Sequence, residues 1–481
     1  MKHKQIISKI NTNYSLTIKV RIVFYVCSVL LGFSFIISGF EWLTFLSLLG
    51  WLYYVDNLSE LTNKQILQDF YIGTFLVMGL AYCWLMQAEA QNWNVSLHGW
   101  FKVVAQIVSW LLVCSFVSLS GLILGWIMSK FVKNRYRILI FVLCLPVIEV
   151  IRSYLFAIIS YGTGGSLAPN FFVGSIAVSA SGTFLVFASR LIGFVGLSLF
   201  GLLLSLGVYL IIRRRFRFVV PTMILISIVT IFGYKLSKNN LSHESLKVVT
   251  VHLNEAVSMK DWQDFSSLPD DVDLLVLPEY SGVTSNENIS KLWEKLSPDG
   301  VVITTVAIGR PPNAVNRLTI FDNEGRVINQ QDKDFLIPAG EYLPYSLMGA
   351  FKLLRQNKNI ENFRYTQQLQ PGSYPINVVQ GGRFKIGALA CSGVVSSSEY
   401  GRLSREGADI LTNSASLSFL KQNSRFDVFG KNMARYQAVA NQKYFVQSSR
   451  SGESFIISPN GRFIETNSSQ NSQIIFTDLE I

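Results

Sequence analysis

Three polar residues of reactive types follow predicted strands in the second half of the sequence. Glu279 follows LLVLP, Lys333 follows RVINQQD and Cys391 follows KIGALA. In α/β folds, ligands bind beyond the carboxyl ends of the strands. We therefore expect the three side chains to converge on one pocket.

The three residue types suit one reaction. A thiol attacks an acyl carbon well only as a thiolate, and a carboxylate can take its proton as a general base. A nearby ammonium lowers the thiol pKa and neutralises the oxyanion that forms on attack. The pattern predicts Cys391 as nucleophile, Glu279 as general base and Lys333 as the stabilising cation. A buried apolar cysteine, a solvated turn glutamate and a surface lysine are the alternatives.

Histidine is not available as the partner of this cysteine in the usual way. The chain has four histidines and none follows residue 252. A cysteine–histidine pair would depend on His252, which lies within an apolar strand pattern and suits the core better. The scarcity of histidine and cysteine ligands also predicts that there is no metal site. Cys391 is the one cysteine of the polar half, because the other four lie in apolar runs: Cys27, Cys83, Cys114 and Cys144.

Composition predicts a membrane protein with two domains. Half of the 481 residues are hydrophobic and only 15% are charged, which is too apolar for a soluble protein of this length. Long uncharged runs fill residues 1–235, whereas charge, Asn, Gly and short alternating segments fill residues 236–481. The first range predicts a polytopic helical membrane bundle, and the second a domain outside the bilayer.

The apolar runs predict seven membrane spans, because about 20 apolar residues are needed to cross the hydrocarbon core. The second run is short and a re-entrant segment is its alternative. The expected ranges are Val20–Phe40, Trp42–Val55, Asp69–Met86, Phe101–Met128, Ile138–Ser160, Val186–Ile212 and Phe218–Tyr234.

Basic residues predict the orientation of these spans. Clusters of Lys and Arg occur before residue 22, at 130–137 and at 213–217, and all three fall on one side if seven spans are counted. Because short basic loops stay in the cytoplasm, we expect residues 236–481 on the outer, periplasmic face of a bacterial inner membrane. The same loops largely explain the net charge of +11, so nucleic acid is not an expected partner.

The polar half predicts an α/β layered fold. Nine short runs rich in Val, Ile and Leu are bounded by Gly, Pro, Asn and Asp, which is typical of strands. Helices are expected at 289–296 and 425–442, and hairpin turns at DNEGRV and SPNGRF. The apolar segment 343–354 predicts either a lid that enters the membrane interface or part of the core.

The motifs resemble a known family. LLVLPEYSG, QDKDFLIPAGEYLPY and KIGALACSG occur in the order found in the carbon-nitrogen hydrolase (nitrilase) superfamily, whose members use a Glu-Lys-Cys triad in an α-β-β-α sandwich. Behind membrane helices, such a domain resembles the apolipoprotein N-acyltransferase family. The most specific part is similar to K-x-x-L-V-P-F-G-E-Y-x-P and is reproduced at Lys333, Leu336, Pro338, Gly340, Glu341, Tyr342 and Pro344.

The resemblance implies supporting residues in both halves. It points to Glu341, Tyr342 and Asn413 as supporting or substrate-binding residues, although Glu341 could simply pair with a backbone donor. In the membrane half, Glu149 and Arg152 in PVIEVIRSYLF resemble an E-x-x-R segment. Charged residues inside a span face a partner or a polar cavity, so the pair predicts either a headgroup site or a structural ion pair.

Several positions depart from the family pattern. The family has an aromatic residue and Glu after the nucleophile, where this chain has Ser392 and Gly393. The sequence ends in the polar, strand-like NSQIIFTDLEI, where the family has a further membrane helix. These departures put full activity in doubt, and the remaining ones replace an Asp, a Trp, a Glu and an Arg at Ser414, Ser416, Ala440 and Lys443.

The resemblance implies acyl transfer without a cofactor. Cys391 would take an acyl chain from a membrane phospholipid as a thioester and pass it to the α-amine of a diacylglyceryl-cysteine lipoprotein. We expect a monomer. Two alternatives remain open: a membrane-tethered amidase or nitrilase in which water resolves the intermediate, and a lipid- or lipoprotein-binding homologue whose catalysis has decayed.

Overall fold

The chain folds into two compact units. The computed structural model describes residues 2–88, 100–238, 245–254, 267–281, 283, 290–418, 420, 425–467 and 472–481. Unit 1 comprises Met1–Met86, Ala105–Phe156 and Phe171–Gly233, whereas unit 2 comprises Gln87–Val104, Ala157–Asn170 and Tyr234–Ile481.

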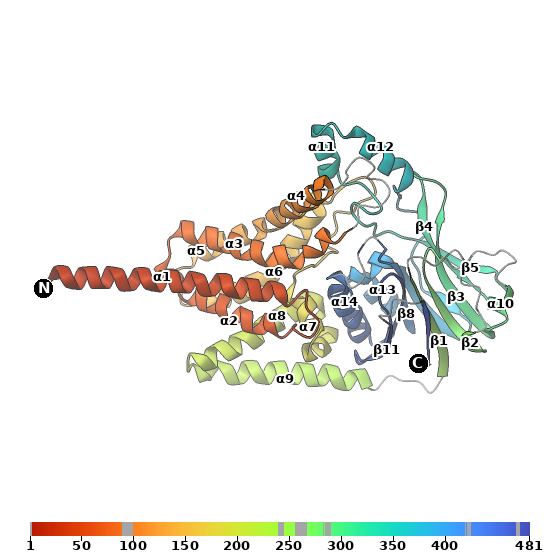
Figure 1. Ribbon diagram of the computed structural model, residues 1–481. Coiled ribbons are helices and arrows are strands. Elements are labelled where there is room, and N and C mark those ends of the chain that lie inside the picture. The colour runs from red at the N-terminus through yellow and green to blue at the C-terminus, as the bar shows by residue number, and fades with distance from the viewer. Residues whose placement is uncertain are drawn as a thin grey trace. The chain divides into compact units, whose positions relative to one another are not determined.

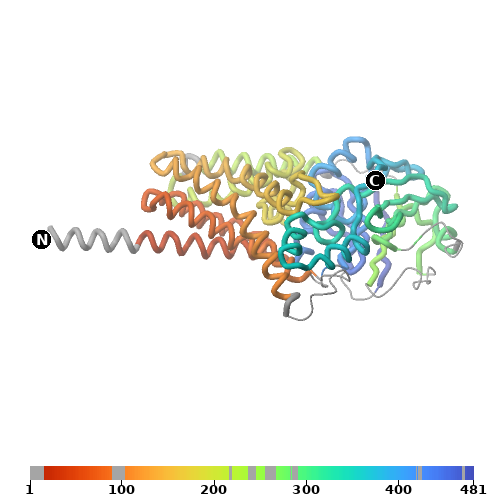
Figure 2. The backbone as a smooth tube through the Cα atoms, turned by 90° about the horizontal axis from the view of Figure 1, so that it is seen from above, coloured from red at the N-terminus to blue at the C-terminus, as the bar shows by residue number. Residues whose placement is uncertain are grey.

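Unit 1 is helical, and its long helices run side by side in both views (Figures 1 and 2). Five stretches within the described residues are long and apolar enough to cross a membrane: Leu16–Phe33, Val103–Lys130, Arg137–Ile159, Phe184–Ile212 and Val219–Leu236. The helices are α1 (Lys2–Phe33), α2 (Leu43–Asp56), α3 (Asn63–Ala81), α4 (Trp100–Val117), α5 (Leu119–Lys130), α6 (Arg137–Ile159), α7 (Ile176–Ser181), α8 (Ser189–Ile212) and α9 (Phe216–Lys238).

Two of the seven expected spans are not among these five. Helix α2 has 14 residues, and at 1.5 Å per residue it is shorter than the roughly 30 Å hydrocarbon core. Helix α3 carries Asp69, whose fully buried carboxylate accepts hydrogen bonds from Arg21 at 2.8 Å and from the Tyr54 hydroxyl at 2.9 Å. Length and hydropathy thus select five of the seven expected ranges, and α2 and α3 do not meet both criteria.

Unit 2 is built on one nearly closed sheet. The strands pair in the order β5-β4-β3-β2-β1-β9-β8-β7-β6, while β10 pairs with β9 and β11, and β12 pairs with β1. The strands are β1 (Ser245–Leu253), β2 (Val272–Glu279), β3 (Leu296–Ile308), β4 (Val315–Phe321), β5 (Val327–Asp332), β6 (Val379–Gly381), β7 (Phe384–Ala390), β8 (Ile410–Ser416), β9 (Tyr444–Arg450), β10 (Ser454–Ile457), β11 (Phe463–Asn467) and β12 (Gln473–Glu480).

The two halves of this sheet pack face to face, and helices cover the outer faces. The core between them joins side chains of β1–β4 to side chains of β7–β9. Helix α10 (Ser290–Trp293) packs with the outer face of β1–β3. Helices α13 (Glu399–Arg405) and α14 (Phe426–Asn441) lie beside β7–β9 (Figure 1). The α-β-β-α sandwich expected for the polar half is confirmed.

Most expected elements of unit 2 are present. All nine predicted strands form, and antiparallel β4–β5 and β10–β11 pairs flank the two predicted hairpin turns. The helix expected at 425–442 is α14. Of the helix expected at 289–296, residue 289 lies outside the described residues, Ser290–Trp293 form α10, and the end is wrong because Leu296 already pairs with Val272 in the sheet. Strand β6, with three residues, was not predicted.

The segment 343–354 forms part of an arm of two helices. Helix α11 (Tyr345–Leu353) is followed by α12 (Asn357–Thr366). Phe351 packs with other buried apolar side chains of this arm, whereas Leu353 and Leu354 are 87% and 69% exposed. The arm therefore combines a packed inner face with an exposed apolar end.

Candidate active site

Glu279 is the last residue of strand β2, at the carboxyl end of that strand. Its carboxylate is buried, and Oε1 accepts hydrogen bonds from Asn316 Nδ2 at 2.5 Å and from Lys333 Nζ at 3.1 Å. Within the described residues, no donor reaches its second oxygen, Oε2. The next residue, Tyr280, has φ 56°, and its N–H donates to Thr305 at 3.0 Å. A bulky residue at positive φ is strained, so the chain after the carboxylate is held in an unusual turn.

Lys333 follows strand β5 and joins two carboxylates. Its ammonium donates to Glu279 Oε1 at 3.1 Å and to Glu341 Oε1 at 2.7 Å. Its backbone N–H donates to the carbonyl of Asn316 at 2.9 Å. An ammonium has three N–H groups, so one donor remains after these two contacts. Lys333 is only 4% exposed, which keeps these contacts out of water.

Cys391 follows strand β7 and starts a 3₁₀ turn, η6 (Cys391–Val395). Its φ is 44°, a left-handed conformation that costs energy for a residue with a side chain. The thiol donates a weak hydrogen bond to the carbonyl of Ser416 at 3.6 Å, and the Cys391 carbonyl accepts from Asn413 at 3.2 Å. The neighbouring strand β8 therefore fixes the strained turn that carries the sulfur.

Charges connect the three predicted catalytic residues. Burial raises the pKa of the Cys391 thiol, the negative charge of Glu279 raises it further, and the Lys333 ammonium lowers it. The lysine acts in the predicted direction, but burial outweighs it. Burial alone would lower the pKa of Lys333, yet electrostatic interactions with Cys391, Glu279 and Glu341 raise it well above its usual value. The thiol is thus protonated at neutral pH and the amine is charged.

A protonated thiol needs a base when it attacks, and Glu279 is the carboxylate with an oxygen to spare. Its Oε1 is occupied, whereas Oε2 has acceptor capacity. Lys333 likewise keeps one N–H for a new acceptor. The cluster can therefore take one proton from a thiol and stabilise one new negative charge.

Glu341 completes the cluster on the lysine side. Its Oε1 accepts from Lys333, and its Oε2 accepts from the backbone N–H of Ile337 at 2.8 Å. Burial raises the pKa of Glu341, and the Lys333 ammonium opposes that rise. Glu341 therefore contacts Lys333 and also pairs with a backbone donor.

Asn413 and Tyr342 hold the backbone around the cluster. Asn413, fully buried on β8, donates to the Cys391 carbonyl and to Gln447 Oε1 at 3.1 Å. The Tyr342 hydroxyl donates to the carbonyl of Ser160 at 2.9 Å, and burial raises the pKa of Tyr342 to about 12. Asn413 therefore touches the nucleophile's backbone, whereas Tyr342 anchors the segment that carries Glu341.

Glu149 and Arg152 form a separate cluster in unit 1. The Glu149 carboxylate accepts from the backbone N–H of Ile176 at 2.8 Å and from the hydroxyls of Ser175 and Ser198 at 2.8 and 2.5 Å. Arg152 lies 3.6 Å from Glu149 and donates to a backbone carbonyl at 2.8 Å. These contacts join helices α6, α7 and α8.

Two contacting residues were not predicted. Asn316, at the start of β4, reaches Glu279 through its side chain and Lys333 through its backbone. Ser392, where the family has an aromatic residue, donates to the carbonyl of Phe335 and so joins the Cys391 turn to the Lys333 segment. In the sequence, the signal for Asn316 was an amide side chain at the start of strand β4.

Three of the departures from the family pattern, Gly393, Ser414 and Ser416, are buried, whereas Ala440 and Lys443 are partly exposed. A Cβ added at Gly393 would lie 2.6 Å from Cβ of Leu389, so the turn after Cys391 has no room for a side chain. On β8, the Ser414 hydroxyl is buried and has no hydrogen-bond partner in the described part of the chain, and the Ser416 hydroxyl bonds to Ser418. Ala440 lies on α14. Gly393 is thus required by packing, and restoring a carboxylate there would not rebuild the site.

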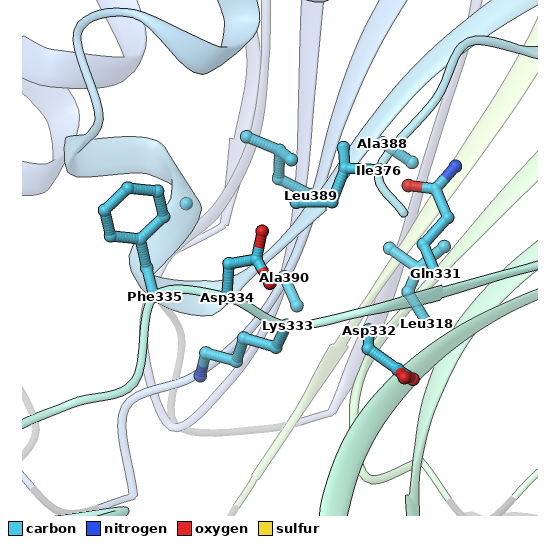
Figure 3. Close-up of a pocket in the computed structure, with 11 residues that line it drawn as sticks. Leu318, Gln331, Asp332, Lys333, Asp334, Phe335, Ile376, Ala388, Leu389 and Ala390 are labelled. Carbon is cyan, nitrogen blue, oxygen red and sulfur yellow. The ribbon is translucent and has the colours of Figure 1, made fainter. Parts of the chain in front are cut away.

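A small cavity lies beside the lysine segment. Figure 3 shows Lys333, Asp334 and Phe335 near Leu389 and Ala390, with the Lys333 side chain extending away from Gln331. The cavity measures about 20 Å³, which is room for about one water molecule. It is therefore too small to hold an acyl chain.

The comparisons with known proteins identify this part of the chain. Residues 259–481 match the family described as carbon-nitrogen hydrolase. Unit 2 carries a carbon-nitrogen hydrolase domain. The match stops short of half of the chain and leaves unit 1 outside it. No curated protein matches the chain.

Solved structures of this superfamily are similar to unit 2. A carbon-nitrogen hydrolase from Helicobacter pylori shares 16% identity over 50% of this chain and 90% of its own, with a TM-score of 0.36. Nit3 from Saccharomyces cerevisiae shares 18% over 50% and 91%, with a TM-score of 0.37. An amidase from Nesterenkonia shares 15% over 50% and 92%, with a TM-score of 0.35.

Proposed function

We propose that the protein is an acyltransferase that moves an acyl chain from a membrane phospholipid to the N-terminal amine of diacylglyceryl-cysteine lipoproteins. The observation that carries the proposal is the buried Lys333 ammonium. It bridges Glu279 and Glu341, and its positive charge favours a lower pKa of the Cys391 thiol. The carbon-nitrogen hydrolase superfamily includes acyltransferases as well as amidases.

In the first step, Cys391 sulfur attacks the ester carbonyl of the phospholipid. The thiol proton passes to Glu279 Oε2 as the S–C bond forms, and the free N–H of Lys333 stabilises the oxyanion. The C–O bond then breaks, and Glu279 returns the proton to the leaving lysophospholipid alcohol. Enzyme thioester and lysophospholipid are the products, so protons and electron pairs balance without a cofactor.

In the second step, the lipoprotein amine attacks the thioester. Glu279 takes the proton that the amine loses, the C–S bond breaks, and the proton returns to the Cys391 sulfur. The products are an amide and the free enzyme. A covalent intermediate divides one difficult transfer into two easier ones, and exclusion of water from a buried site protects the thioester.

The membrane-length helices support lipid substrates. Both proposed substrates reside in a bilayer, and an enzyme in the same bilayer meets them at a high effective concentration. We place the chain in a bacterial cytoplasmic membrane with unit 2 on the periplasmic face, on the basis of the basic loops. Accessibility labelling tests this placement: in a cysteine-free background, Glu324→Cys should react in intact cells, whereas Asn134→Cys should react only after permeabilisation.

The function is tested by trapping the thioester. Purified protein in nanodiscs, given a phospholipid with a labelled acyl chain, should acquire label on Cys391 that hydroxylamine removes. A diacylated lipopeptide with a free amine should then discharge the label into an amide, and the same peptide with an acetylated amine should not.

Two other outcomes would replace the proposal. If label reaches Cys391 and is released as free fatty acid with the lipopeptide present, the protein is a membrane-tethered hydrolase. If no phospholipid labels Cys391 in folded protein, transfer is excluded and a lipid- or lipoprotein-binding role takes its place.

A further inference from the structure

Asn316 stands out among the residues that contact the predicted catalytic groups. It is fully buried at the start of β4, and its Nδ2 donates to Glu279 Oε1 at 2.5 Å. Its backbone carbonyl accepts the N–H of Lys333 at 2.9 Å. One residue therefore contacts both the predicted base and the predicted cation.

The contact decides which oxygen of Glu279 can act. Oε1 accepts two donors, Asn316 Nδ2 and Lys333 Nζ, so its lone pairs are occupied. Oε2 accepts no hydrogen bond within the described part of the chain. Without Asn316 the carboxylate would keep only the Lys333 contact and could rotate about its last side-chain bond, because such sp² torsions are broad.

Burial of the Asn316 side chain costs free energy, and packing alone does not explain why an amide occupies this position. Its Oδ1 is buried and has no hydrogen-bond partner among the described residues. A buried acceptor without a partner is unfavourable compared with an apolar side chain of similar size. The chain thus keeps an amide at this position, and the contact that amide makes is with Glu279.

We propose that Asn316 is a positioning residue that fixes the Glu279 carboxylate so that Oε2 receives the Cys391 proton. The inference rests on the proposed role of Cys391 as a nucleophile, but not on phospholipid as the acyl donor. It assigns no contact between Asn316 and the substrate. Loss of the amide should slow proton transfer in the acylation step and leave the number of competent sites unchanged.

The test uses the full chain in nanodiscs with p-nitrophenyl butyrate, an activated ester. Its leaving group needs no proton, so nitrophenolate release reports attack by Cys391 and the first proton transfer alone. The burst amplitude counts competent sites and the burst rate constant measures acylation. Asn316→Ala should lower the rate constant about tenfold to a hundredfold, as expected for a lost hydrogen bond to a charged group, with the amplitude unchanged.

A matched variant and an isosteric variant serve as controls. Asn329→Ala, on the neighbouring strand β5, also removes an amide with a buried, unpaired Oδ1 and should leave the rate constant unchanged. Asn316→Asp keeps the shape of the side chain and replaces the donor with a second carboxyl beside Glu279. It should lower the rate constant at least as much as Asn316→Ala, and it answers the question if the alanine variant does not fold.

Three results would overturn the inference. One is a rate constant for both Asn316 variants within about twofold of the unchanged protein. Another is a loss confined to burst amplitude, which a purely structural role would give. The third is an unchanged protein whose Cys391 is not acylated by the ester. If the ester acylates Cys391 but phospholipid does not, the proposed function fails while the role of Asn316 remains measurable.

Discussion

The protein holds two buried acid–base clusters, and they differ in which donors and acceptors remain without a hydrogen bond. In unit 1, Glu149 accepts from a backbone N–H and two serine hydroxyls, with Arg152 beside it. In unit 2, Glu279 uses one oxygen and Lys333 uses two of its three N–H groups. The Glu149 carboxylate is satisfied, although Arg152 donates only one hydrogen bond within the described residues and lines a small cavity, whereas in unit 2 both the carboxylate and the ammonium keep hydrogen-bonding capacity.

A buried charged residue is therefore not by itself evidence of a reactive site. Both carboxylates are buried, and both stand near a cation. Only the unit 2 cluster adds a thiol on a strained turn and leaves capacity for one proton and one oxyanion. We infer that the unit 1 cluster holds helices together and that the unit 2 cluster is the reactive one.

Removing the cation of unit 2 should have the largest effect. Lys333→Ala deletes the predicted oxyanion donor and leaves two buried carboxylates facing each other, so we expect the acylation rate constant to fall by about 10²–10³ or more. Stopped-flow release of nitrophenolate measures it. Lys352→Ala, on the arm helix α11, is the matched control and should acylate normally. Normal acylation by Lys333→Ala would remove the lysine from the mechanism.

Breaking the unit 1 cluster should cost stability instead of rate. Glu149→Leu leaves Arg152 without its counter-charge and two serines without their acceptor, which we expect to cost about 3–5 kcal/mol of unfolding free energy. Thermal unfolding in detergent measures the loss, and acylation per folded molecule should be unchanged. Val147→Ala, an exposed position on the same helix, serves as control. A stable Glu149→Leu protein that no longer accepts phospholipid would instead support a headgroup site.

Filling the turn after Cys391 should have a moderate effect on both properties. Gly393→Ala places a methyl group 2.6 Å from Cβ of Leu389, and overpacking of this kind costs about 1–3 kcal/mol. Gly393→Glu should therefore be slower than the unchanged protein, although it restores the family's residue. The double variant Gly393→Ala/Leu389→Ala keeps this Cβ contact and should not recover the lost stability. Acylation faster in Gly393→Glu than in the unchanged protein would contradict this packing argument.

The smallest effect is expected for the pH dependence of alkylation at Cys391. Because burial and Glu279 raise the pKa of Cys391, the thiol is protonated below that pKa and its thiolate fraction grows only as pH rises toward it. Alkylation of Cys391 by iodoacetamide should therefore keep increasing above about pH 8.5, where an ordinary cysteine is half ionised. Peptide mass spectrometry follows the reaction. A plateau below pH 7 would mean that the resting form is already a thiolate.

Local patterns were sufficient to predict the α-β-β-α fold of unit 2. The runs around Glu279, Lys333 and Cys391 combine apolar strands with polar ends, and the structure brings Glu279 and Lys333 within 3.1 Å of each other. Short or non-local elements were harder. Strand β6 has three residues, and nothing in its sequence states that it pairs with β7. Asn316 was missed for the same reason, because its partner Glu279 is 37 positions away.

The membrane half shows the limit of counting apolar residues. Helix α3 has enough length, but Asp69 binds Arg21 and Tyr54 from neighbouring helices. A charged residue satisfied in this way cannot be distinguished in sequence from one that ends a span.

Unit 2 is discontinuous along the chain, since it includes Ala157–Asn170 as well as the residues after Tyr234. Tyr342 donates to the carbonyl of Ser160, and the N–H of Tyr345 donates to that of Tyr161 at 2.8 Å. A soluble fragment cut at residue 236 would lose these acceptors and strip one side of the segment that presents Glu341. Recombinant production of unit 2 therefore has to carry the 157–170 peptide with it, either in the intact chain or grafted through a linker.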